Sequence, residues 1–144
     1  MISTRGRYAL RMMLDLSEHS TDGFVALKDI AARQNISKKY LEQIIPVLNR
    51  AGLLQTTRGV QGGYRLARKP SEYTVGDILR VTETSLNSVA CLEPGATSCP
   101  REQECLTKPV WEGLDRVVNE YLDSITLQDI LDRRQSAVGN DYVI

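Results

Sequence analysis

The sequence predicts a mainly α-helical fold that carries one small β-hairpin. Three observations support this prediction. Apolar residues recur at spacings of three and four over several segments, as on one face of a helix. Two short strand-like runs flank a glycine-rich turn at residues 58–63. A wide apolar stripe follows residue 107. Together they predict a winged helix-turn-helix domain followed by a long dimerisation helix.

The first predicted helix spans residues 4–19, and its apolar residues lie on more than one side. We therefore expect it to contact both the winged domain and a second subunit. Arg5 and Arg7 lie at its start, where free backbone N–H groups also attract anions, so both are candidate phosphate contacts. His19, the only histidine, ends the helix and is interpreted as a C-terminal cation rather than a metal ligand.

Residues 27–34 and 37–50 predict two helices joined by a short turn, the arrangement of a helix-turn-helix. Ser37 is a suitable N-cap. Pro46 predicts a kink or an early end, so DNA contacts should come from the residues before it. Tyr40 is interpreted equally as a core residue or a phosphate contact. An αα-hairpin without a ligand would show the same periodicity. The candidate base contacts on the polar face are Lys38, Lys39, Glu42 and Gln43.

A β-hairpin wing is predicted after the second of these helices. Residues 53–57 and 64–66 have strand character, and the six residues between them include three glycines, as a tight turn requires. Arg58 lies at the predicted tip and is a candidate contact to phosphate or the minor groove. The glycines of the wing, which we expect to let the backbone approach DNA closely, are Gly59, Gly62 and Gly63.

The C-terminal half is predicted as a helix, a loop and two further helices. A capping box beginning at Thr74 predicts a helix over residues 75–83. Residues 84–106 lack periodicity, and a loop of this length is usually functional or disordered. Thr107 and Thr126 are predicted N-caps of a long and a short helix. A two-fold dimer would cover the apolar stripe of the long helix, although an intramolecular core helix is the alternative. The candidate interface residues are Trp111, Leu114, Val118 and Tyr121.

These elements divide the chain into a DNA-binding domain (1–83), a cysteine loop (84–106), the dimerisation and terminal helices (107–134) and a tail (135–144). Net charge is zero, but residues 1–70 hold 12 Lys/Arg and 5 Asp/Glu, whereas the rest hold 6 and 13. The basic half coincides with the helix-turn-helix, as expected for a protein that binds double-stranded DNA.

Other function classes find no support in the sequence. There is no run of about 18 apolar residues and no signal peptide, so we predict a cytoplasmic protein without a membrane partner. We also find no paired acid and base, no nucleophile constellation and no phosphate loop, which argues against an enzyme.

Cys91, Cys99 and Cys105 are the only cysteines and lie within fifteen residues. Three soft thiolates in one loop can converge on one metal centre. A disulfide is disfavoured in the cytoplasm, and the cysteine count is odd. The spacing by itself leaves an iron–sulfur cluster, a zinc ion and unligated thiols equally open, although structural zinc sites more often contain C-x2-C pairs.

The order of four motifs resembles one family of regulators. The motifs are Ser3-Thr-Arg-Gly-Arg-Tyr8, Tyr40-Leu-Glu-Gln43, Arg58-Gly-x-x-Gly-Gly-Tyr64 and the three-cysteine loop. They resemble the IscR-like transcription regulators, whose relatives include NsrR and CymR, over about residues 1–135. The resemblance implies a homodimer on a palindromic operator, with Glu42 and Gln43 contacting bases. It also implies an iron–sulfur cluster held by the three cysteines, with 2Fe–2S favoured over 4Fe–4S.

The chain departs from this family pattern at the cysteine loop. The first spacing is x7 instead of x5, and Lys108 stands where the family has a histidine ligand. Protonated lysine has no lone pair, so the fourth ligand is open. The candidates are a residue of the partner's first helix, a small molecule, or one of Glu93, Glu102 and Glu104. Two functional alternatives follow: a cluster-independent repressor of the cysteine-metabolism type, and an iron–sulfur carrier or scaffold without operator binding.

Overall fold

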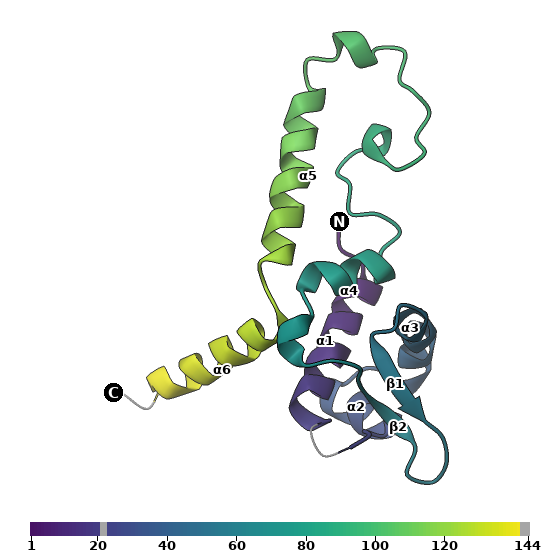
Figure 1. Cartoon of the computed structure of the whole chain (residues 1–144), viewed down its shortest axis with the longest axis vertical. Helices are drawn as coiled ribbons and strands as arrows, with labels where there is room; N and C mark the ends of the chain where they lie inside the picture. Colours follow the sequence, from purple (N-terminus) through teal and green to yellow (C-terminus); the bar gives the residue numbers. More distant parts are fainter. Residues whose placement is uncertain (21–22, 142–144) are drawn as a thin grey trace.

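Three helices and a β-hairpin form one end of the molecule (Figure 1), and they confirm the predicted winged helix-turn-helix order. The computed structural model describes residues 1–20 and 23–141. Ser37 caps the third helix by accepting from the Tyr40 amide. Asn35 ends the second helix in the left-handed conformation, which asparagine tolerates. The bounds are α1 Thr4–His19, α2 Leu27–Gln34, α3 Lys38–Arg50, β1 Leu54–Thr57 and β2 Gly63–Leu66.

The core of this end is built around α1, which is buried on several sides as predicted. Met12 and Met13 are neighbours in sequence, yet both are fully buried, because different elements cover the two sides of the helix. Helices α2 and α3 and the short helix α4 (Val75–Thr82) all pack on α1. Fully buried side chains from these elements include Leu16, Ile30, Leu41, Ile44, Leu48 and Ile78.

The wing is a two-stranded antiparallel sheet with Leu54 opposite Leu66 and Thr57 opposite Gly63. The segment before α2 adds a short edge to it, because the backbones of Val25 and Tyr64 exchange hydrogen bonds of 2.8 and 2.9 Å. The wing is therefore joined to the helix-turn-helix by backbone bonds as well as by apolar packing.

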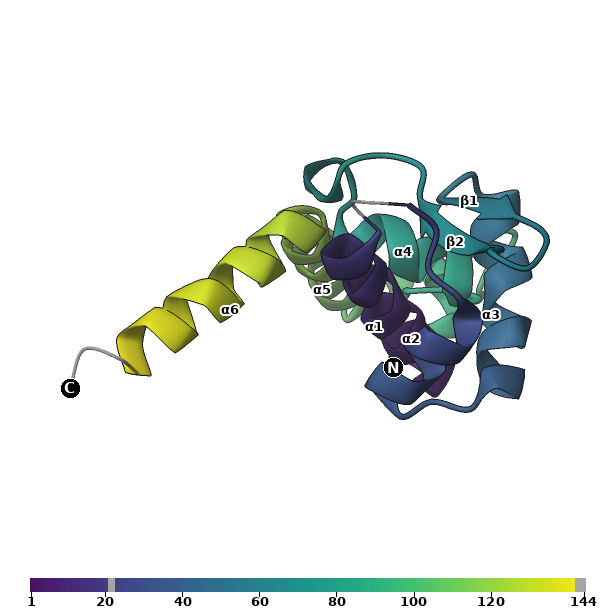
Figure 2. The ribbon, with the colours of Figure 1, turned by 90° about the horizontal axis from the view of Figure 1, so that it is seen from below.

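The second half of the chain projects from this end in two directions (Figures 1 and 2). Helix α4 (Val75–Thr82) begins at the predicted capping box, since Thr74 and Asp77 exchange bonds of 3.0 Å. The loop that follows contains two 3-10 turns, Ala90–Leu92 and Glu102–Glu104, and a third lies before α4 at Pro70–Glu72. Helix α5 (Lys108–Asp123) then extends away from the winged domain, and α6 (Leu127–Asp141) leaves it on another side.

Several boundaries differ from the predictions. Pro46 does not end α3, which continues to Arg50. Thr107 occupies the cap position of α5 but makes no capping hydrogen bond, because its hydroxyl lies 3.4 Å from the Cys105 sulfur instead. Helix α6 continues to Asp141 and so includes seven residues of the predicted tail; residues 142–144 lie outside the described residues.

None of the helices in the described part of the chain combines the length and hydrophobicity that a membrane span requires.

Candidate DNA-binding surface and cysteine loop

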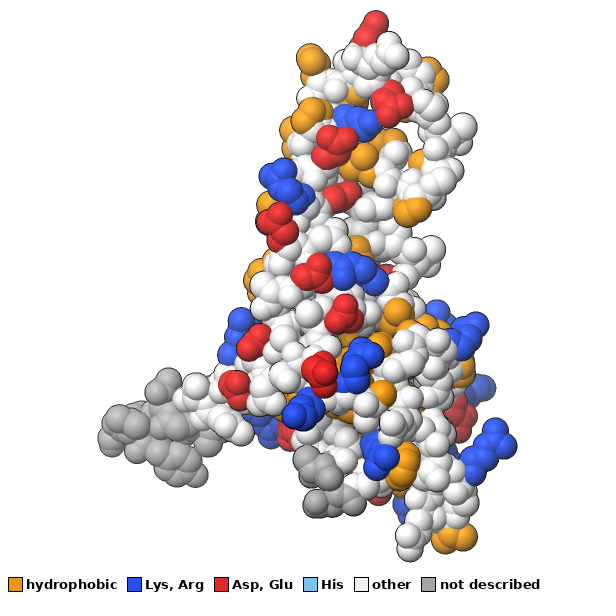
Figure 3. All heavy atoms as spheres, in the orientation of Figure 1, with side chains coloured by type: hydrophobic (Ala, Val, Ile, Leu, Met, Phe, Trp, Pro, Cys, Tyr) orange, Lys and Arg blue, Asp and Glu red, His pale blue; other side chains and the backbone are white. Residues whose placement is uncertain are grey.

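The polar face of α3 is the centre of the candidate DNA-binding surface. Its opposite face is buried through Leu41, Ile44, Ile45 and Leu48. Figures 1 and 2 place α3 and the wing on the same side of the molecule, opposite α6. Figure 3 shows basic side chains near this side, whereas acidic side chains follow α5. All four predicted base-contacting residues are exposed: Lys38, Lys39, Glu42 and Gln43.

Tyr40 lies beside this face, but its ring packs inward. It is half-buried against the core, and its ring meets that of Tyr8 edge to face, with centroids 5.3 Å apart. The guanidinium of Arg11 lies over the same Tyr8 ring at 5.3 Å. Of the two interpretations of Tyr40, the packing favours the core. The pair of tyrosines joins the start of α1 to the start of α3.

The wing tip is exposed. Arg58 and Gly59 are both accessible, and Gly59 has a φ of +108°, a conformation that glycine adopts without strain. Behind the tip, Arg65 donates to Gln55 across the hairpin and lies over the Phe24 ring at 4.4 Å. These contacts hold the wing on the domain and leave Arg58 free to reach outward.

Two of the wing glycines have a structural reason to be glycine. A Cβ on Gly63 would lie 2.2 Å from the carbonyl oxygen of Val25, so a side chain there would force the edge segment away from β2. A Cβ on Gly62 would lie 2.8 Å from the backbone oxygens of Gly59 and Thr57. Gly63 is also buried, so internal packing accounts for it without any approach to DNA.

The start of α1 already holds an anion. The Glu83 carboxylate accepts from both the amide and the hydroxyl of Ser3 at 2.8 Å, and a Cβ on Gly6 would overlap it. A phosphate would therefore compete with this carboxylate for the end of the helix, contrary to the expectation of a free backbone site. Arg5 and Arg7 are exposed and would act through their side chains.

A buried carboxylate, that of Asp15, holds α2 in position. Sequence analysis did not single out this residue. Asp15 is 2% exposed and accepts two hydrogen bonds from Arg33, at 2.7 and 2.9 Å, and one from Gln34 at 3.0 Å. Burial opposes ionisation, but these donors outweigh it and hold the pKa of Asp15 below its usual value. The available signal was a charged residue inside the apolar stripe of α1.

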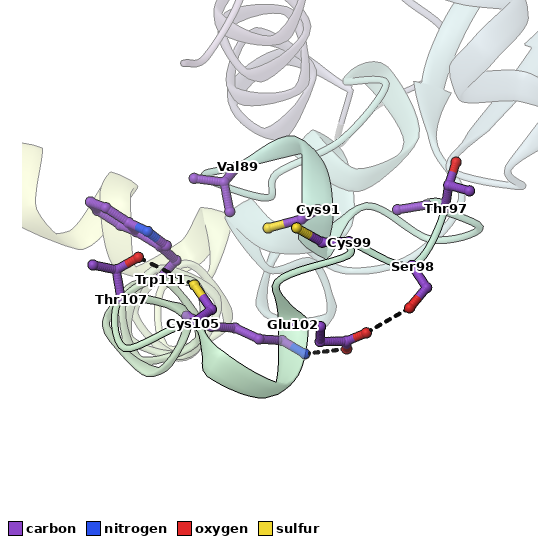
Figure 4. Close-up of a pocket in the computed structure, with 11 residues that line it drawn as sticks. Val89, Cys91, Thr97, Ser98, Cys99, Glu102, Cys105, Thr107 and Trp111 are labelled. Atoms are coloured by element: carbon purple, nitrogen blue, oxygen red, sulfur yellow. Dashed lines mark hydrogen bonds and ion pairs between the residues drawn. The ribbon is translucent and has the colours of Figure 1, made fainter.

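The three cysteines line one pocket between the loop and the start of α5 (Figure 4), with a volume of about 290 Å³. Cys91 and Cys99 are exposed and Cys105 is half-buried. Hydrogen bonds from the Thr107 hydroxyl and from the backbone of Thr107 and Lys108 lower the pKa of the Cys105 thiol. Val89 and Trp111 form apolar parts of the wall.

The donor chemistry of this pocket suits a soft metal centre, since three thiols face one cavity. In the described residues, however, no three Cys, His, Asp or Glu side chains are grouped closely enough to hold a metal ion. The residues fit an iron–sulfur cluster in type and location. Holding one would require the loop to bring its sulfur atoms closer together.

Lys108, which replaces the expected histidine, is engaged in an ion pair. Its ammonium lies 2.6 Å from the Glu102 carboxylate, which also accepts from the Ser98 hydroxyl at 2.9 Å. The hydrogen bond from Lys108 and then that from Ser98 lower the pKa of Glu102. Lys108 therefore points a cation, and not a ligand, at this pocket.

Helix α5 has no buried residue along its sixteen positions. The C-terminal end of α5 is joined to α4 by hydrogen bonds. Arg80 of α4 donates to both carboxylate oxygens of Asp123 at 2.7 and 2.8 Å and to Asn119 at 2.9 Å. Figure 3 shows hydrophobic side chains along its outer edge. Of the predicted interface residues, Val118 is half-buried, and Trp111, Leu114 and Tyr121 are 36%, 45% and 60% exposed.

Comparison with known proteins agrees with this architecture. Residues 2–133 match the Rrf2 family, described as an iron-dependent transcriptional regulator. The chain belongs to the Rrf2 family. It is 38% identical over 130 residues to the HTH-type transcriptional regulator IscR of Aliivibrio salmonicida, covering 90% of this chain and 76% of that protein.

Solved Rrf2-family structures share the fold. The IscR of T. potens superposes with a TM-score of 0.75 at 44% identity, over 95% of this chain and 90% of that one. CymR, the global cysteine regulator of B. subtilis, gives 0.74 at 38% identity, over 92% and 97%. The predicted fold class and the resemblance to IscR-like regulators are confirmed. The chain is a DNA-binding transcription regulator, and its family is one of regulators rather than enzymes.

Proposed function

We propose that this regulator is a homodimer that binds a palindromic operator and that an iron–sulfur cluster held by Cys91, Cys99 and Cys105 modulates its binding. The observation that carries the proposal is the exposed apolar stripe of α5 beside the pocket lined by all three cysteines. A stripe of this width on a helix is normally covered, and a second copy of α5 has the same chemistry.

DNA recognition would use two copies of α3 in successive major grooves, about 34 Å apart along the duplex. Gln43 suits an adenine edge, and Glu42 accepts from cytosine while repelling bare acceptors. Lys38 and Lys39 lie in the first turn of α3, where they reach bases or adjacent phosphates. Arg58 would enter the minor groove or contact phosphate, and the exposed Arg5 and Arg7 would contact the backbone. Such a protein acts in the cytoplasm, where its operator lies.

The cysteine loop connects the end of α4 to the start of α5, so its conformation bears on the angle between the DNA-binding domain and the dimer axis. The Ser88 amide donates to Asp115 of α5 at 2.8 Å. The Glu83 carboxylate, which precedes the loop, accepts hydrogen bonds from Ser3, the N-cap residue of α1. Fixing the loop around a cluster would therefore bias both the spacing of the two recognition helices and the position of α1.

The test is anaerobic purification followed by absorption spectroscopy and by iron and sulfide analysis. Sedimentation would give the oligomeric state. Operator binding is then compared between the loaded protein and a Cys91→Ala, Cys99→Ala, Cys105→Ala variant. We expect a coloured dimer and a change in affinity or site choice in the variant. Identical binding by the two proteins would refute cluster control, and a monomer would refute the dimer.

The cluster-independent alternative has its own support. The chain superposes on CymR almost as well as on IscR, and its donors are not grouped as a metal site. A repressor of this type would remain colourless after anaerobic purification and bind its operator unchanged by iron. A cluster carrier would instead transfer iron and sulfide to an acceptor protein and ignore the operator.

A further inference from the structure

The fourth ligand is the unsolved part of the proposed cluster site. Iron–sulfur clusters of the two common types are held by four protein donors, and this loop offers three thiols. Lys108 does not complete the set, because its ammonium is held by Glu102. A fourth donor must come from another side chain near the pocket or from outside the chain.

Among the three glutamates of the loop, the structure singles out Glu102. It lines the pocket together with all three cysteines, whereas Glu93 and Glu104 do not. Figure 4 shows the Glu102 carboxylate at the edge of the pocket, between the Ser98 hydroxyl and the Lys108 ammonium. The first turn of α1 contains no acidic residue, so a second copy would bring no carboxylate from that turn.

We propose that Glu102 is the fourth ligand of this centre, an inference that rests on the proposed cluster function. Its carboxylate is held at the pocket by Lys108 and Ser98, and these hydrogen bonds lower its pKa, which favours the anionic form that binds iron. Glu102 would exchange its bond to Lys108 for a bond to iron. The freed ammonium has another acceptor, because the Glu112 carboxylate one turn along α5 lies 3.8 Å away.

The experiment compares the wild-type protein with three variants, each reconstituted anaerobically with ferrous iron and sulfide. Glu102→Gln removes the anionic oxygen and keeps the size of the side chain. Glu104→Gln is the matched control, since Glu104 lies in the same turn but does not line the pocket. Lys108→Met removes the cation and leaves Glu102 in place. The readouts are iron content, the EPR signal of the reduced cluster and its lifetime in air.

We expect Glu102→Gln to take up iron through the three thiols but to show a changed EPR signal and a cluster lifetime shorter by roughly tenfold, the size of effect seen when partners of a metal site are removed. Glu104→Gln and Lys108→Met should keep the wild-type signal. A wild-type signal and lifetime in Glu102→Gln would overturn the assignment. Lys108→Met reproducing the loss would overturn it too, because Glu102 would then act only through its ion pair.

A Glu102→Cys variant provides a second measurement. A thiolate at the ligand position should shift the absorption and EPR spectra towards those of an all-cysteine cluster, and unchanged spectra would count against the assignment. The outcomes separate this proposal from the broader one. If the wild-type protein takes up no iron, the cluster function itself is refuted. If the wild-type protein takes up iron and the Glu102 variants keep its spectra and cluster lifetime, only the assignment of Glu102 as the fourth ligand is refuted.

Discussion

Asp15→Asn tests whether the buried carboxylate positions the helix-turn-helix. The amide keeps the shape of the side chain but removes the charge and presents a donor to Arg33, which is itself a donor. Breaking a buried charged pair costs about 3–5 kcal/mol, but the Arg33 side chain is 36% exposed and can be resolvated. We therefore expect a loss of about 2 kcal/mol in the free energy of unfolding and a fall of roughly 4–8 °C in Tm.

The effect should depend on pH in a defined direction. The folded-state pKa of Asp15 lies below its unfolded value, so the ionised carboxylate stabilises the fold above the unfolded pKa. This contribution is lost as pH falls through the folded pKa. The difference in free energy of unfolding between wild type and Asp15→Asn should be largest at neutral pH. It should become smaller below about pH 4, near the unfolded pKa of aspartate.

The assay is thermal and denaturant unfolding at one fixed protein concentration, because a dimer makes stability depend on concentration. Glu120→Gln is the control, since that side chain is 71% exposed and its ion pair with Arg116 is 3.9 Å long. An exposed pair of this kind contributes about 0–1 kcal/mol. The reasoning fails if Asp15→Asn is as stable as this control, or if its deficit is the same at acid and neutral pH.

Three further changes probe the wing, the interface and the internal packing. Arg58→Ala should weaken binding to every duplex alike and reduce the slope of log affinity against log salt by about 0.9; Arg116→Ala on α5 is the control, and an equal slope in both would contradict a role at the DNA. Leu114→Glu should raise the dimer dissociation constant at least roughly tenfold in sedimentation, since a buried leucine contributes about 1.5–3 kcal/mol; an unchanged dimer would show that α5 does not form the interface. Gly63→Ala should lower the free energy of unfolding by about 1–3 kcal/mol, because its Cβ meets a backbone carbonyl at 2.2 Å that cannot rotate away; undiminished stability with weaker DNA binding would instead favour a role in approaching DNA.

Most of the fold could be predicted from the sequence, because its signals are local. Ser37 and Thr74 cap their helices through bonds to amides three residues on, and such contacts follow directly from spacing. The helix-turn-helix and the wing were predicted with boundaries within one or two residues of those observed. Thr107 lies at the predicted N-cap position of α5, but its hydroxyl contacts the sulfur of Cys105, two residues earlier, and not a helix amide.

The candidate site was predicted less completely. Spacing and residue type identified the three cysteines and the exposed side of α3, but the role of Gly63 depends on the carbonyl of Val25, 38 positions away in sequence. The anion at the start of α1 is Glu83, which is separated from Ser3 by 80 positions. Sequence periodicity does not predict contacts of this kind, because each contact joins two segments that the fold of the whole chain brings together.

The sequence by itself determined the helices, their caps, the tight turn of the wing, the charge asymmetry and the set of thiols, since these depend on neighbours within about one helical turn. Tertiary structure decided which carboxylate reaches each cation. It buried Asp15 against Arg33, fixed Asp123 on Arg80 and selected Glu102 from three glutamates to hold Lys108 beside the thiols. The physical reason is that an ion pair needs both charges within about 4 Å. The packing of α1 on α2 brings Asp15 to Arg33, the packing of α4 on α5 brings Arg80 to Asp123, and the folded cysteine loop brings Glu102 to Lys108.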